Sequence, residues 1–165
     1  MKLINRMTSV LEQLCAVMMI IMIVVVFMQV IARYFLHNSL TWSEELARYL
    51  LIWITFFGSA LALKQGVHIN VGLLLQVLPT NMKKVVLVIN DISISAFLTV
   101  LLFKGIDLVR STIHQPSPAI GIPIGLVYIV MPLSAIAMLL FLFNEFFKKV
   151  IKKESELDSH GTRSF

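Results

Sequence analysis

Charged side chains are scarce in this sequence: Asp, Glu, Lys and Arg make up 14% of its 165 residues, while 58% are hydrophobic. Soluble domains contain roughly 25% charged and 45–50% apolar residues. A chain with so little charge cannot cover its apolar side chains with a polar surface. The composition therefore excludes an ordinary water-soluble protein and predicts an integral membrane protein.

Cysteine and chemically reactive patterns are also scarce. Cys15 stands alone, so no disulfide can form within the chain, and we expect it to be a small buried residue of a helix. Metal-ligand spacings, a phosphate-binding glycine loop and a nucleophile beside a base are all missing. A transmembrane haem would need histidines inside facing helices, and the four histidines fall outside the apolar runs: His37, His68, His114 and His160. We expect no enzyme activity and no bound cofactor.

Four long apolar runs dominate the sequence instead, at residues 10–32, 46–63, 85–109 and 124–147. A hydrocarbon core of about 30 Å needs about 20 helical residues, and continuous runs do not fit the alternating segments of a transmembrane β-barrel. The first run exceeds the roughly 7–15 apolar residues of a cleavable signal, so it should remain as an anchor. The predicted fold class is all-α, with one four-helix membrane domain, 1–149, and a polar tail, 150–165.

The segment 67–78 is apolar but too short to span a membrane. We expect a short helix lying on the membrane surface, ended by Pro79. An ordinary loop is the alternative.

Basic residues distinguish the two sides of the predicted bundle. With both termini on one side, ten Lys and Arg lie on that side and four on the other, namely Arg33, Arg48, Lys104 and Arg110. They form no stripe interleaved with aromatic residues, so nucleic acid is not an expected partner. The positive-inside rule predicts that both termini are cytoplasmic.

A group of polar residues precedes the second run. Thr41-Trp42-Ser43-Glu44 matches the capping box of a helix start, and Arg48 lies within one turn of Glu44 and Glu45. The sequence therefore predicts a local charge network, with Trp42 at the headgroup level. Two interpretations stay open: a capped helix with a solvated ion pair, or a periplasmic surface that contacts a partner protein through Arg33, Trp42, Glu44, Glu45 and Arg48.

Two features lie within or between the later runs. Asp91 is an acidic residue well inside a predicted span, where it could belong to an ion pathway or hold helices together, and the second is favoured in so small a chain. Pro116, Pro118 and Pro123 predict a rigid turn between the last two spans, and Pro132 predicts a kink near the middle of the last.

Three stretches together resemble the small membrane subunit of tripartite ATP-independent periplasmic (TRAP) transporters, the DctQ-like family. They are Arg33-Tyr34 followed by Trp42-Ser43-Glu44-Glu45 and Arg48; Gly58 through Lys64 to His68-Ile69; and Pro118 to Pro123 with Tyr128 and Pro132. The resemblance covers the chain up to about Lys149. After Ile69 the family often has an acidic residue where this sequence has Gly72, so no charged contact is expected there.

The resemblance implies a secondary transport system of the bacterial inner membrane. In such systems a soluble periplasmic protein captures an organic acid, such as sialic acid or a C4-dicarboxylate, and delivers it to two membrane subunits. This chain resembles the smaller subunit, a scaffold that braces the large multi-span subunit and helps to dock the binding protein. The substrate and sodium sites are then expected in the large subunit.

Two other functions stay open from the sequence. One is a membrane anchor or electron-carrying subunit of a respiratory complex, and the other is a small transporter that works as a homodimer.

Overall fold

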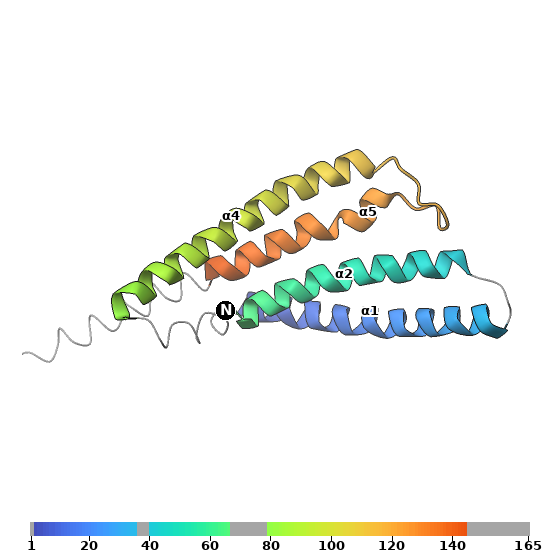
Figure 1. Cartoon of the computed structure of the whole chain (residues 1–165), viewed down its shortest axis with the longest axis horizontal. Coiled ribbons are helices and arrows are strands. Elements are labelled where there is room, and N and C mark those ends of the chain that lie inside the picture. The colour runs from blue at the N-terminus through green and yellow to red at the C-terminus, as the bar shows by residue number, and fades with distance from the viewer. Residues whose placement is uncertain (1, 36–39, 67–78, 145–165) are drawn as a thin grey trace, which may run out of the picture.

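A computed structural model of the chain describes residues 2–35, 40–66 and 79–144 (Figure 1). The helices are α1 (Lys2–Phe35), α2 (Thr41–Gly66), α4 (Thr80–Thr112) and α5 (Ile124–Tyr128), and helix resumes over 130–144. Within these residues, four stretches are long and apolar enough to cross a membrane: Asn5–Phe35, Thr41–Gln65, Val85–Thr112 and Ile124–Asn144. The all-α membrane fold class is therefore confirmed. The predicted surface segment 67–78, the end of the fourth predicted span and the tail 150–165 lie outside the described residues.

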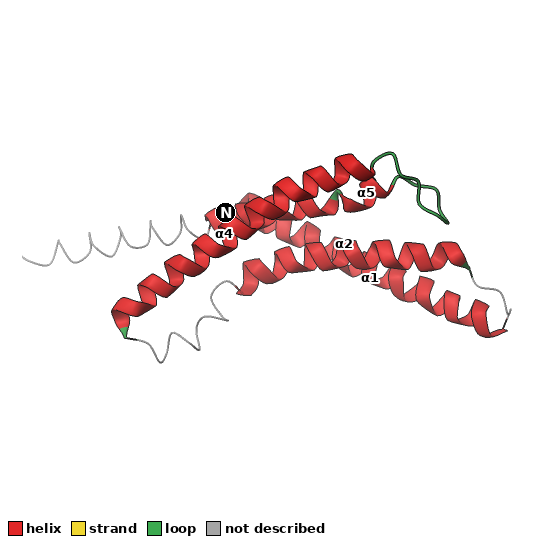
Figure 2. Ribbon diagram, turned by 45° about the horizontal axis from the view of Figure 1, so that its top comes forward, coloured by secondary structure: helices red, strands yellow, loops and turns green. Residues whose placement is uncertain are grey.

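The helices form two antiparallel hairpins. α1 packs along α2, and α4 packs along α5 and the helix that follows it (Figures 1 and 2). The hairpins converge near the N-terminus and separate toward the turns at the other end, which we call the loop end (Figure 1). Where they converge, a buried cluster joins α2, α4 and the last helix: Ala60, Leu98, Met138 and Phe141.

Most apolar side chains of α1 face outward. Ile20 and Phe27 are 62% and 66% exposed, and only 6% of the apolar window of α1 is buried. Exposure to water would cost roughly 1.5–3 kcal/mol for each such side chain, so hydrocarbon or a partner protein must cover them. Cys15, which we expected to be buried, is only partly buried on this helix.

Gly125 allows the second hairpin to close tightly. A Cβ atom at this position would lie 2.7 Å from Ile113 Cα and 2.8 Å from Val109 O. Small residues permit this kind of close approach between helices in membranes. The first turn of α5 is therefore pressed directly against the backbone at the end of α4.

The last span is interrupted one turn after its start. The helical pattern breaks at Ile129, although Ile129 N donates to Gly125 O at 3.1 Å and Leu133 N donates to Ile129 O at 3.2 Å. Pro132 has no N–H to donate to the carbonyl of Tyr128, which accounts for the break. The irregularity predicted from Pro132 is thus present, but nearer the start of the span than its middle.

Candidate functional site

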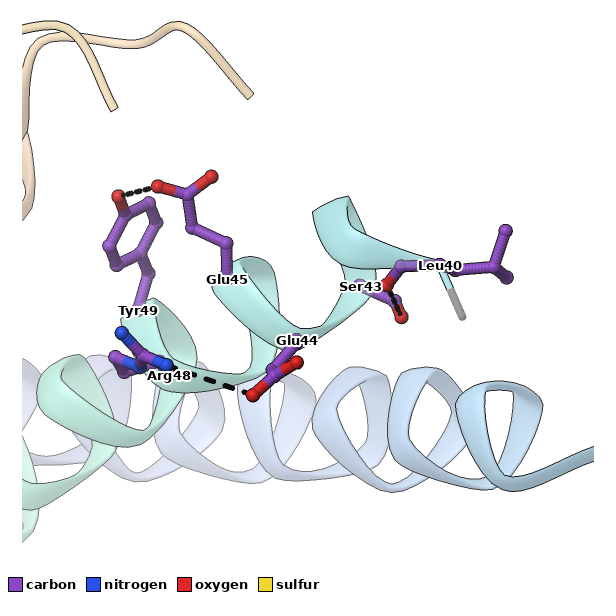
Figure 3. Close-up of polar contacts among 6 residues, drawn as sticks. All are labelled: Leu40, Ser43, Glu44, Glu45, Arg48 and Tyr49. Carbon is purple, nitrogen blue, oxygen red and sulfur yellow. Dashed lines mark hydrogen bonds and ion pairs between the residues drawn. The ribbon is translucent and has the colours of Figure 1, made fainter. Parts of the chain in front are cut away.

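The first turns of α2 carry the α2 polar cluster, which we define as Glu44, Glu45, Arg48 and Tyr49 (Figure 3). The helix start before it is fixed by Ser43, which is fully buried. Its hydroxyl donates to Leu40 O at 2.7 Å and its backbone nitrogen to the same oxygen at 3.1 Å. In the described part of the chain no hydrogen bond joins Thr41 to Glu44, so the predicted capping box is not formed, and the Ser43 hydroxyl bonds a carbonyl and not an orphan N–H.

Glu44 and Arg48 form the ion pair expected from their spacing. Arg48 Nη2 lies 3.9 Å from Glu44 Oε1, and the two side chains are 67% and 63% exposed. An exposed pair at this spacing contributes about 0.3–0.5 kcal/mol, because water and salt screen it. The pair therefore leaves both charges available at the surface.

Glu45 lies on the other side of α2 and binds a distant part of the chain. Its Oε2 accepts hydrogen bonds from the backbone nitrogens of Ala119 and Ile120, both at 2.8 Å, and its Oε1 accepts one from the Tyr49 hydroxyl. Glu45 is only 8% exposed. Its carboxylate is thus satisfied by Tyr49 and by the turn between α4 and α5, and not by Arg48 as expected from spacing.

The turn between α4 and α5 that binds Glu45 is held by its own internal hydrogen bonds. Ser117 N donates to Ile122 O and Ile124 N to Gln115 O, both at 2.9 Å. Gly121 has a φ of +78°, a backbone conformation that favours glycine, and its N–H donates to Ser117 Oγ at 3.0 Å. This arrangement presents two successive N–H groups, on Ala119 and Ile120, which would lack partners without a carboxylate.

The Glu45 contact joins the two hairpins at the loop end, where the helices otherwise separate (Figure 1). Sequence reasoning missed it, since 74 residues separate Glu45 from Ala119 and no spacing rule connects them. We call this contact the Glu45 clasp: Glu45, Tyr49, Ala119 and Ile120.

Lys64 makes a corresponding contact where the hairpins converge. Its Nζ donates to Thr8 Oγ1 at 2.5 Å and lies 5.9 Å from the centre of the Phe141 ring. Thr8 is 6% exposed. Lys64 therefore links α1, α2 and the last helix.

The other predicted site residues lie apart from the clasp. Trp42 is 41% exposed, and Arg33 is exposed at the end of α1, with no ion pair to Glu44 or Glu45 among the described residues. Asp91 is half-buried in the first half of α4, and its backbone carbonyl accepts a hydrogen bond from Ser95 Oγ at 2.8 Å. The roles proposed for these residues stay predictions.

The described residues contain no group of three or more His, Cys, Asp or Glu side chains that could hold a metal ion. In this structure Glu45 and Lys64 hold helices together. Glu44 and Arg48 are charged and exposed at the loop end.

Comparisons with known proteins place these features in a family. Residues 22–152 match the family model described as "Tripartite ATP-independent periplasmic transporters, DctQ component". A Haemophilus influenzae protein described as a TRAP transporter small permease protein is 28% identical over 137 residues, which cover 83% of each chain. The isethionate TRAP transporter permease protein DctMQ of Oleidesulfovibrio alaskensis is 29% identical over 124 residues, which cover 70% of this chain and 20% of that protein.

A third relative is the sialic acid TRAP transporter small permease protein SiaQ of Vibrio cholerae, which is 30% identical over 80 residues, covering 48% of this chain and 46% of that protein. The match covers most of the chain, and the four residues of the Glu45 clasp lie within the matched range. This chain therefore belongs to the DctQ family of small TRAP transporter membrane subunits.

Proposed function

We propose that this chain is the scaffold subunit of a sodium-coupled TRAP transporter, which braces a large transport subunit during the import of an organic acid. Members of the family are transporter subunits, so the chain is not an enzyme. The observation that carries the scaffold role is the Glu45 clasp, which fixes the turn between α4 and α5 to α2.

A scaffold must keep its shape while its partner moves. The two hairpins of this chain are joined at both ends, by the buried cluster around Leu98 and Phe141 and by the Glu45 clasp. Each join crosses from one hairpin to the other, so relative motion of the hairpins would break buried packing or charge-assisted hydrogen bonds. The chain is therefore built as one rigid unit.

The large partner is supported by the fused relative. The matching part makes up 20% of the protein named DctMQ, so most of that protein has no counterpart in this chain. We infer that a separate large subunit supplies this missing part here. The outward-facing apolar side chains of α1 and α4, including Phe27, Phe97 and Phe103, offer ample surface for it.

The transported compound is proposed as an organic acid such as sialic acid or a C4-dicarboxylate. The names of two relatives specify sialic acid and isethionate, both organic acids. Substrate and sodium are assigned to the large subunit, since the half-buried or buried charges Lys64 and Glu45 of this chain are engaged in joining helices. No cofactor is assigned to this chain.

Docking of a periplasmic binding protein is assigned to the loop end, with both termini in the cytoplasm and the helices in the inner membrane. Glu44, Arg48 and Arg33 are exposed there, and Trp42 is beside them in the sequence. Exposed charges of both signs suit a transient contact that is steered electrostatically and weakened by salt.

The test is co-purification and uptake. The chain is expressed with its large subunit and binding protein, extracted in mild detergent, and reconstituted in vesicles with labelled sialic acid or a C4-dicarboxylate outside. We expect the large subunit to co-purify and sodium-dependent uptake to need all three proteins. A chain that purifies alone, together with uptake that is intact after its deletion, would refute the scaffold role.

A further inference from the structure

A narrow apolar groove lies between the first half of α1 and the last helix, with a volume of about 400 Å³. Val10 and Leu14 form one wall, Ile136 and Leu140 form the other, and Phe57 of α2 closes the base. Arg6 lies at one end of the groove. The wall side chains are 44–50% exposed, so the groove is open to the surroundings.

We propose that this groove binds one anionic phospholipid, with its phosphate at Arg6 and an acyl chain along the apolar walls. Arg6 is the second residue of the candidate span Asn5–Phe35, so a bilayer that covers this span puts its guanidinium at the level of the membrane surface. Leu14 lies eight residues deeper, which corresponds to about 12 Å along a helix. The groove therefore runs from the headgroup region into the hydrocarbon.

The dimensions of the groove select its occupant. The groove has a volume of about 400 Å³ and runs about 12 Å along α1, while a whole helix with its side chains is about 10–12 Å across. A hydrocarbon chain can lie inside the groove along its length, whereas a helix of a partner protein would lie over its open side.

The charge of the groove selects the headgroup. A guanidinium donates paired hydrogen bonds to phosphate oxygens, and basic pockets between transmembrane helices bind anionic headgroups. One cation near the membrane surface favours an anionic lipid by about fivefold. One cation at the membrane surface with apolar walls below it matches the charge and shape of an anionic lipid. This proposal does not depend on the proposed transport function.

The proposal is tested by native mass spectrometry of the full chain, purified in a neutral detergent and mixed with equal amounts of phosphatidylglycerol and phosphatidylcholine. The wild type should retain one phosphatidylglycerol with about fivefold preference. Arg6→Gln should reduce that preference to about one. Arg110→Gln, which removes an exposed cation from the end of α4, is the matched control and should change nothing.

Two further variants fill the groove from opposite walls. Ile136→Trp and Leu14→Trp start from half-exposed side chains, so both should fold, as circular dichroism can verify, and both should lose the retained lipid. Equal retention of the two lipids by the wild type would overturn the proposal, as would an equal loss in Arg6→Gln and Arg110→Gln. If Ile136→Trp instead released a co-purified large subunit and kept the lipid, the groove would be a protein contact.

Discussion

The carboxylate of Glu45 lies 2.8 Å from the backbone nitrogen of Ala119, although 74 residues separate them along the chain. The neighbouring Glu44 makes no such contact and pairs with Arg48 at the surface. Two adjacent glutamates therefore have different roles, one inside the fold and one on its exterior. Substitutions at the two positions should separate stability from partner binding.

Removal of the Glu45 carboxylate should destabilise the chain. Glu45→Ala leaves the N–H groups of Ala119 and Ile120 without their acceptor, so the thermal unfolding midpoint in detergent should fall clearly. Glu44→Ala, the matched control on the same turn, should change the free energy of unfolding by no more than about 0.5 kcal/mol. Equal midpoints for the two variants would show that the clasp contributes nothing.

The Tyr49 hydroxyl should contribute more to stability when Glu45 is present. Tyr49→Phe removes one hydrogen bond to the carboxylate and should lower the unfolding midpoint in the wild-type background. In the Glu45→Ala background the same change should have a smaller effect, because the hydroxyl has already lost its carboxylate partner and keeps only its interaction with Ser117. Additive effects in this double-mutant cycle would contradict direct coupling between the two side chains.

Charge reversal should distinguish a docking role from a structural role. Glu44→Lys should keep the unfolding midpoint but lower uptake, with a changed salt dependence, because the charge lies at the surface. Glu45→Lys should lower both quantities. A chain truncated after residue 150 is the comparison. If its uptake equals that of Glu44→Lys, the surface around Glu44 has no docking role.

Gly125 should tolerate no side chain. Gly125→Ala places a Cβ 2.7 Å from Ile113 Cα, where only backbone movement can relieve the clash, and overpacking of this kind costs about 1–3 kcal/mol. Gly58→Ala is the matched control, since nothing lies within 4 Å of the added atom and alanine favours the helix by up to about 1 kcal/mol. Unfolding in detergent should therefore shift in opposite directions for the two variants.

Lys64 should contribute more to stability than another cation of the chain. Lys64→Met loses the hydrogen bond to Thr8 and the contact with the Phe141 ring, at an expected cost of about 1–3 kcal/mol. Lys104→Met is the comparison, since Lys104 forms an exposed ion pair with Asp107, with 3.7 Å between Nζ and Oδ2. A similar midpoint for both variants would contradict the role of Lys64 as a link between helices.

The helices could be predicted from the sequence because lipid imposes a simple requirement on it. Each apolar run must form its own backbone hydrogen bonds, so run length alone identifies a span. The helices α1 and α4 begin earlier than the predicted apolar runs. Polar residues such as Lys2 and Thr80 continue the helical backbone beyond the apolar residues.

The contacts between helices could not be predicted in the same way. Only the fold brings Thr8 beside Lys64 and Ala119 beside Glu45. Both partners are distant in the sequence, and neither the type nor the spacing of residues signals them. The Glu44–Arg48 pair was predictable because both residues lie on one helix turn.

The unequal burial of the helices also bears on how the chain is made. α1 has a mean hydropathy of 3.0 in its most apolar window and only 6% of that window is buried, so it can enter the bilayer during synthesis without help from later segments. The last span has 39% of its window buried, against residues of earlier helices. Its docking must therefore wait until those earlier helices are in place.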